Sequence, residues 1–187
     1  ANPGGEPLVT GNDEALARLS TIADGYLMHD RDIVVGCDDS VVRALPGSED
    51  HGFQFVRRAR GYTPQAIRLA RAGPPVLAVG GYFKNTVCVT RGDEAFVSQH
   101  VGDLDNAATC KAMERVAEHL LSILDVTPEI VVHDLHPDFH STRFGARFAH
   151  AHGVPALGVQ HHHAHVAAVI AEHRLDGPVL GLALDGV

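Results

Sequence analysis

The stretch VPALGVQHHHAHVAAVIAEH, residues 154–173, decides the fold of this chain. Its first part, residues 155–160, is a short apolar run that follows a glycine, which is typical of a buried strand. Its second part, residues 161–173, carries apolar residues at helical spacing and predicts an amphipathic helix. A strand that passes directly into a helix indicates an α/β fold.

The predicted helix begins with four histidines in five residues, 161–165. His161 and His165 are four positions apart, so they lie on one face of the helix and can share one ion. Imidazole is a ligand for Zn, Fe, Ni or Cu, and a carboxylate often completes such a site. The alternative is a solvated helix start that is only rich in histidine.

The same alternation of strands and helices continues on both sides of this stretch. Helices are predicted at 107–124 and 140–152, and strands at 130–133 and 179–184. Three β-rich runs precede them and predict an antiparallel meander, at 76–80, 86–90 and 95–100, separated by Gly80-Gly81 and Arg91-Gly92-Asp93. The expected architecture is α/β, with meander and crossover units in one sheet.

The N-terminal part of the chain has a different organisation. It contains a predicted helix at 13–26, a strand at 33–36 and a β-rich run at 41–43. Residues 61–75 are rich in Gly, Pro and Arg and form the best candidate linker. The sequence therefore predicts one unit at 1–60, a linker at 61–75 and a second unit at 76–187. We also expect the chain to be an internal fragment of a longer protein.

Polar residues follow several of the predicted strands. His133, Asp134 and His136 come at the end of one strand, and Asp185 follows another. Ligands of open α/β sheets bind at the carboxyl ends of strands, so Asp185 is expected to join His161 and His165 around a metal. His133, Asp134 and His136 are candidates for supporting or substrate-binding groups, or for a simple hydrogen-bonded strand end.

A second polar group lies in the first predicted β-turn. Lys84, Asn85 and Thr86 there offer a cation, an amide and a hydroxyl to a phosphate. An ordinary hairpin turn that contains asparagine explains these residues nearly as well.

The composition excludes several classes of protein. The net charge of −8 argues against a nucleic-acid or acidic-membrane surface, despite a local run of arginines at 57–60. The three cysteines, Cys37, Cys88 and Cys110, form no CxxC pair, and Cys88 is expected to be a buried residue rather than a nucleophile. No apolar run approaches the ~20 residues of a membrane span, and the first residues do not resemble a signal peptide. A cytoplasmic protein is expected.

Two long motifs resemble one known family. HDLHPDFHSTRF at 133–144 and VQHHHAHVA at 159–167 are similar to the C-terminal, Kae1-like domain of the HypF-type hydrogenase-maturation carbamoyltransferases. Residues 84–86 and 98–104 are similar to further segments of that domain. Residues 2–7, 29–31, 37–43 and 57–62 resemble the end of the family's YrdC-like domain. The resemblance covers almost the whole chain.

The resemblance implies a fold and an activity. The part after the linker would be the first half of a Kae1-like domain of the actin and Hsp70 ATPase type, and the part before it the end of a YrdC-like α/β domain. Family members use carbamoyl phosphate and ATP, form carbamoyl adenylate, and transfer the carbamoyl group to the C-terminal cysteine of a partner, HypE. That product is later dehydrated to the cyanide ligand of nickel–iron hydrogenase.

The resemblance also implies site residues. His161 and His165 match metal-binding histidines, and Asp185 is a further ligand candidate for Fe or Zn. Asn2, Ser40 and Arg43 match positions near the adenylate site of the YrdC-like domain. Most of the YrdC-like domain and the second half of the Kae1-like domain are missing, so this chain alone is expected to be inactive.

Two other functions compete with this interpretation. One is an O-carbamoyltransferase that acts on a small-molecule hydroxyl and is built from the same two domains. The other is a metal-binding or docking module without turnover. Against the second, the histidines lie between a predicted strand and a predicted helix, whereas metal carriers usually hold them in low-complexity tracts.

Overall fold

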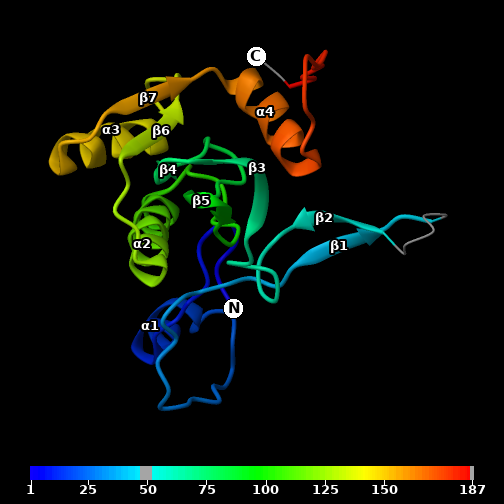
Figure 1. Ribbon diagram of the computed structural model, residues 1–187. Coiled ribbons are helices and arrows are strands. Elements are labelled where there is room, and N and C mark those ends of the chain that lie inside the picture. The colour runs from blue at the N-terminus through cyan, green and yellow to red at the C-terminus, as the bar shows by residue number, and fades with distance from the viewer. Residues whose placement is uncertain (47–51, 186–187) are drawn as a thin grey trace.

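The computed structural model describes residues 1–46 and 52–185 and contains two sheets (Figure 1). A two-stranded antiparallel ribbon pairs β1 (Val41–Ala44) with β2 (Phe53–Arg57) and projects from the rest of the chain. The second sheet has five strands in the order β3-β5-β4-β6-β7. Its strands are β3 (Ile67–Gly73), β4 (Val76–Ala78), β5 (Cys88–Val97), β6 (Ile130–Asp134) and β7 (Ala156–Val159). The α/β class is confirmed.

The five-stranded sheet is mixed. β5 pairs antiparallel with both β3 and β4, whereas β4, β6 and β7 run parallel to one another. The parallel part is built from two crossovers, because α2 (Ala107–Leu124) leads into β6 and α3 (His140–His152) connects β6 to β7. The carboxyl ends of β6 and β7 therefore meet at one edge of the sheet.

The core lies between this sheet and helices α2 and α3. Its fully buried residues are apolar side chains from β4, β5, α2, β6 and the segments that flank them, namely Leu77, Val79, Val87, Val89, Met113, Ala117 and Val131. α2 buries one stripe at helical spacing, as its sequence predicts. α3 packs on β6, and Gly145 allows the approach, because a Cβ there would lie 3.3 Å from the Cβ of His133.

The helix ends follow capping rules. The Asn106 side chain accepts a hydrogen bond of 2.9 Å from the Thr109 amide at the start of α2. α3 ends at Gly153, whose φ of 67° is the left-handed conformation common after helices. α4 (His161–His173) begins at Gln160, which caps the His163 amide at 2.9 Å. These three helices have the predicted bounds.

Several predicted elements differ from the structure. The runs at 86–90 and 95–100 form one strand, β5, which passes through Gly92 in a left-handed conformation, φ 60°. The predicted linker at 61–75 contains β3, which pairs with β5 at the edge of the sheet. Over the described residues 76–100, two strands therefore stand where three short ones were predicted, and the segment expected to be a linker is partly a strand.

The remaining differences concern the two ends of the chain. The first helix is shorter than predicted, α1 (Asn12–Leu19). Residues 33–36 and 179–184 were expected to be strands and form none, because neither segment has a pairing partner within the described residues. Residues 179–185 instead run beside α4. In the parts of the chain described, no helix is both long and apolar enough to cross a membrane.

Candidate metal centre

Three of the sequence-predicted residues come together at the carboxyl edge of the sheet. His161 and His165 lie one turn apart at the start of α4, and their Nε2 atoms are 3.2 Å apart. Asp185 Oδ2 lies 3.0 Å from His161 Nε2 and 3.1 Å from His165 Nε2. The i, i+4 spacing and the folding back of the C-terminal segment together produce this cluster.

The donor set and its spacing fit a divalent metal. Tetrahedral ligation with metal–ligand distances of ~2.0–2.2 Å separates neighbouring ligand atoms by ~3.3–3.6 Å. The three separations in this cluster, 3.0, 3.1 and 3.2 Å, are slightly shorter than that range. Two imidazoles and one carboxylate form a ligand set that accepts either Fe or Zn. His161, His165 and Asp185 could therefore hold such an ion.

His161 has a second carboxylate partner on its other nitrogen. Its Nδ1 lies 2.5 Å from Asp134 Oδ2 at the end of β6, and the Asp134 side chain is only 8% exposed. The hydrogen bond to Asp134 raises the pKa of His161, although partial burial opposes the change. A Cβ on Gly81 would lie 3.4 Å from His161 Cε1, so the loop after β4 also borders this ring.

The structure separates His133 and His136 from the cluster. Successive side chains of a strand point to opposite faces, so His133 lies on the α3 side of β6, whereas Asp134 faces α4. The positions of Gly145 and Gly158 border His133, and its Nδ1 is 2.7 Å from the Asp134 carbonyl oxygen. His136 stacks on Phe139 with 4.2 Å between ring centroids. Neither imidazole reaches the metal candidates.

Of the residues predicted to bind phosphate, 84–86, Asn85 has a structural role in this chain. Asn85 is 1% exposed, and its Nδ2 donates to Val79 O at 2.9 Å and Gly81 O at 2.8 Å. This side chain shapes the Gly80-Gly81 turn beside His161, and its Oδ1 is buried with no hydrogen-bond partner among the described residues. Thr86 is half-buried, and only Lys84 is exposed.

The residues predicted to lie near an adenylate site, Asn2, Ser40 and Arg43, form no common hydrogen-bonded cluster among the described residues, and the hydrogen bonds of Asn2 and Ser40 go to other residues. Asn2 donates to Glu6 O at 2.6 Å, and Ser40 donates to Arg60 O at 2.9 Å while it accepts from the Ala59 amide. Arg43 is exposed on β1. Within residues 1–46 and 52–185 no hydrogen bond or ion pair joins Asn2, Ser40 and Arg43 to one another, so their role stays a prediction.

None of the three cysteines is an activated thiol. Burial raises the pKa of Cys88 to about 11, and burial also raises the pKa of Cys37 and Cys110. A nucleophilic cysteine needs a lowered pKa, and the pKa of each of these three thiols is raised.

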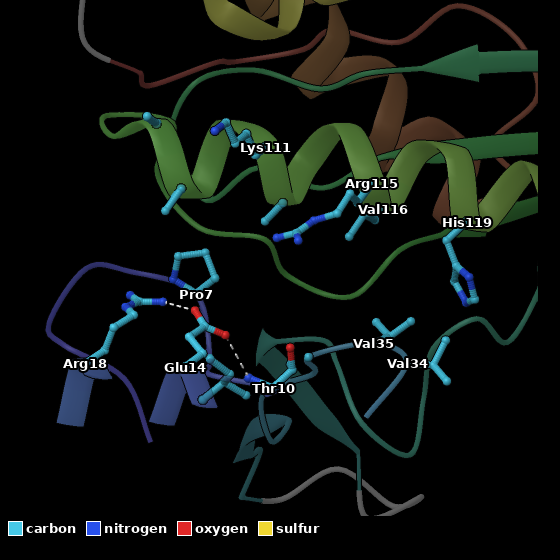
Figure 2. A pocket seen from close by; sticks show the side chains of 15 residues that line it. Pro7, Thr10, Glu14, Arg18, Val34, Val35, Lys111, Arg115, Val116 and His119 are labelled. Carbon is cyan, nitrogen blue, oxygen red and sulfur yellow. Dashed lines mark hydrogen bonds and ion pairs between the residues drawn. The ribbon is translucent and has the colours of Figure 1, made fainter. Parts of the chain in front are cut away.

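The described residues enclose cavities in at least two places. One, about 460 Å³, lies between α4 and residues 179–185 and has His165 and Asp185 at its rim. The other, about 510 Å³, lies between the N-terminal segment and α2 (Figure 2). Arg18 and Glu14 pair on one wall of the second cavity, and Lys111 and Arg115 project from α2. No sequence-predicted site residue lines it.

The sequence analysis missed two glycines that allow close packing, Gly181 beside α4 and Gly80 beside Thr86. A Cβ on Gly181 would lie 2.5 Å from Val166 Cγ2, so only glycine lets residues 179–185 run this close to α4 and bring Asp185 to the histidines. A Cβ on Gly80 would lie 2.3 Å from Thr86 O. The Gly80-Gly81 pair is a visible turn signal, whereas Gly181 stands alone in an apolar run.

The mixed α/β sheet with its crossover helices is the fold of the Kae1-like class, as comparison with known proteins shows. A family model described as the HypF Kae1-like domain matches residues 71–172, more than half of the chain. The chain belongs to the HypF carbamoyltransferase family. Both the recognition of this family and the Kae1-like fold are thereby confirmed.

Curated relatives match the entire chain. Carbamoyltransferase HypF2 of Cupriavidus necator is 67% identical over 187 residues, which cover 100% of this chain and 23% of that protein. Carbamoyltransferase HypF of Rhizobium leguminosarum bv. viciae is 56% identical over 100% of this chain and 24% of its own length. The chain thus spans about a quarter of the curated relatives it matches.

Two solved structures have the same fold. Full-length HypF in a phosphate- and nucleotide-bound form superimposes with a TM-score of 0.89 and 43% identity, covering 99% of this chain and 28% of that one. HypF of T. kodakarensis gives a TM-score of 0.90 with 36% identity and covers 100% of this chain and 24% of that structure. The similarity therefore includes the N-terminal residues that the family model leaves out.

Proposed function

We propose that the full-length protein carrying this chain is a carbamoyltransferase of hydrogenase maturation. It would use carbamoyl phosphate and ATP, form carbamoyl adenylate, and carbamoylate the C-terminal cysteine of a HypE-like partner. The observation that carries the proposal is the cluster of His161, His165 and Asp185 in a chain whose relatives are named carbamoyltransferases.

The transfer step is an acyl transfer. The thiolate sulfur of the partner attacks the carbamoyl carbon, a carbon–sulfur bond forms, and the bond from that carbon to the adenylate oxygen breaks with AMP as the leaving group. A divalent Fe or Zn ion would supply Lewis-acid charge for the phosphate or the carbonyl oxygen. In this chain, His161, His165 and Asp185 would hold that ion.

The neighbouring residues contribute position and access. The exposed histidines and Asp185 keep the cluster open to a substrate, since their side chains are 39%, 55% and 45% exposed. The Gly80-Gly81 turn, which Asn85 holds through hydrogen bonds to Val79 O and Gly81 O, lies against His161. The exposed Lys84 follows in the same loop and is the cation that remains available to a phosphate.

The experiment measures metal content together with two activities of the full-length protein. The activities are carbamoyl-phosphate-dependent ATP–pyrophosphate exchange and carbamoylation of a HypE-like acceptor. The variants are His161→Ala and His165→Ala, and His163→Ala is the control because its exposed ring has no contact in the cluster. We expect His161→Ala and His165→Ala to lose metal and carbamoyl transfer while the control keeps both. Unchanged metal content in both variants would refute the ligand assignment, and exchange without carbamoyl phosphate would refute the substrate class.

A further inference from the structure

Asp134 is held more firmly than an ordinary surface carboxylate. Its side chain is 8% exposed, and its Oδ1 accepts a hydrogen bond of 2.8 Å from the His136 amide. Its Oδ2 is therefore fixed in position when it meets His161 Nδ1 at 2.5 Å. The Asp134 carbonyl oxygen also accepts from Thr142 Oγ1 at 3.0 Å, which anchors the end of β6 to α3.

The chemistry of this contact decides which nitrogen of His161 is free. A carboxylate accepts hydrogen bonds and does not donate them, so Nδ1 must carry the hydrogen. Nε2 faces His165 and Asp185 at 3.2 and 3.0 Å, and an ion bound there would take the place of a proton on this atom. With the hydrogen on Nδ1, the neutral ring would then present the Nε2 lone pair to that ion. The contact of Nδ1 with the buried Asp134 carboxylate holds the ring in this orientation.

Another histidine–carboxylate pair in the same structure has a different character. His140 Nε2 lies 3.0 Å from Glu114 Oε1, but the Glu114 side chain is 31% exposed and the same oxygen also accepts from Arg147 at 2.9 Å. That carboxylate is shared, partly hydrated and linked to no ligand cluster. Asp134 differs from Glu114 because its carboxylate is buried and pairs with a single imidazole, that of His161.

We propose that Asp134 is a positioning residue that fixes the orientation and tautomer of His161, so that Nε2 is presented to a divalent metal. Asp134 does not touch the ion and acts only through the imidazole. Carboxylate partners of this kind orient ligand histidines and increase their basicity. This inference rests on the metal site of the proposed function and assigns its supporting group.

The test compares three variants of the full-length protein. Asp134→Asn keeps the shape of the side chain, so the fold is expected to survive, but it removes the charge and allows an amide N–H to face Nδ1. Asp138→Asn is the matched control, because its exposed carboxylate lies in the same loop and pairs with Arg143. His161→Ala reports on the metal site itself. The measurements are the Kd for Co²⁺ and Zn²⁺ by chelator competition, and the visible spectrum of the Co²⁺-saturated protein.

The expected result for Asp134→Asn is a metal affinity weaker by about 10- to 100-fold and an altered Co²⁺ spectrum at saturation. Asp138→Asn should match the parent protein in both measurements. An unchanged Kd in Asp134→Asn overturns the inference, and so does a weaker Kd with an unaltered saturated spectrum, since that result indicates only a structural role. If His161→Ala also retains the metal, the proposed metal site fails, whereas loss in His161→Ala alone leaves that site standing and rejects only the role of Asp134.

Discussion

Replacing Gly80 by alanine tests the geometry of the turn that borders His161. Gly80 has a φ of 69°, and a Cβ there would lie 2.3 Å from Thr86 O and 2.9 Å from Asn85 Nδ2. The left-handed conformation costs alanine ~1–2 kcal/mol. The clash is with backbone, so the turn must open and the buried Asn85 bonds weaken, which costs a further ~1–3 kcal/mol. We expect Gly80→Ala to lower the free energy of unfolding by about 2–5 kcal/mol.

Gly92→Ala is the matched control for this prediction. Gly92 also has a positive φ, 60°, but nothing lies within 4 Å of its Cβ position, so it should lose only the conformational term of ~1–2 kcal/mol. Urea unfolding followed by far-ultraviolet circular dichroism measures both variants. With a denaturant slope of about 2 kcal/mol/M, Gly80→Ala should unfold at ~0.5–1.5 M less urea than Gly92→Ala. Equal midpoints would refute the clash argument.

Three further outcomes are expected. Met113→Ala should lower the free energy of unfolding, measured in urea, by ~2–5 kcal/mol, because Met113 is fully buried. Leu182→Ala, at an 80% exposed position, should lower it by under ~0.5 kcal/mol. Similar losses in the two variants would contradict the assignment of the core. Asn106→Ala should lower the thermal stability by ~0.5–2 kcal/mol and Asn106→Asp should retain most of it, because Asp still accepts the Thr109 amide bond. Burial raises the pKa of Cys88 to about 11, so the neutral thiol favours the folded state below pH ~8.5, and this contribution is lost as the pH rises toward 11. Iodoacetamide at pH 8.5 should therefore alkylate Cys88 much more slowly in the folded chain than in urea, and equal rates would show that the thiol is not buried.

The helices after residue 100 could be predicted from sequence because their signals are local. Periodic apolar residues and caps such as Asn106 and Gly153 lie within the segments they define. The strands were harder, because pairing depends on distant residues. Arg91-Gly92-Asp93 has the composition of a turn but continues β5, since β4 and β3 pair with its two halves. The Gly- and Pro-rich segment at 61–75 contains the edge strand β3, which could not be predicted because it forms by pairing with β5.

The candidate site could be predicted in part. The i, i+4 spacing of His161 and His165 needs only a helix. Asp185 was predicted from the rule that ligands gather at strand ends, but residues 179–184 form no strand, and Asp185 reaches the histidines because this segment runs beside α4. Strand alternation could also have separated His133 from Asp134, because Val131 and His133 share the face that packs on α3. The buried state of Asn85 could not be predicted, because it depends on how the Gly80-Gly81 turn folds over it.

Helix α4 has no fully buried residue, although it provides two of the three ligand candidates. Elements with little burial open locally at a low free-energy cost, whereas α2, with six buried residues, is expected to open only with the whole core. An ion shared by His161, His165 and Asp185 would join α4 to residues 179–185, so part of its binding free energy would become local folding free energy. Amide hydrogen exchange in α4, compared with and without metal, would therefore report directly on occupancy of the site.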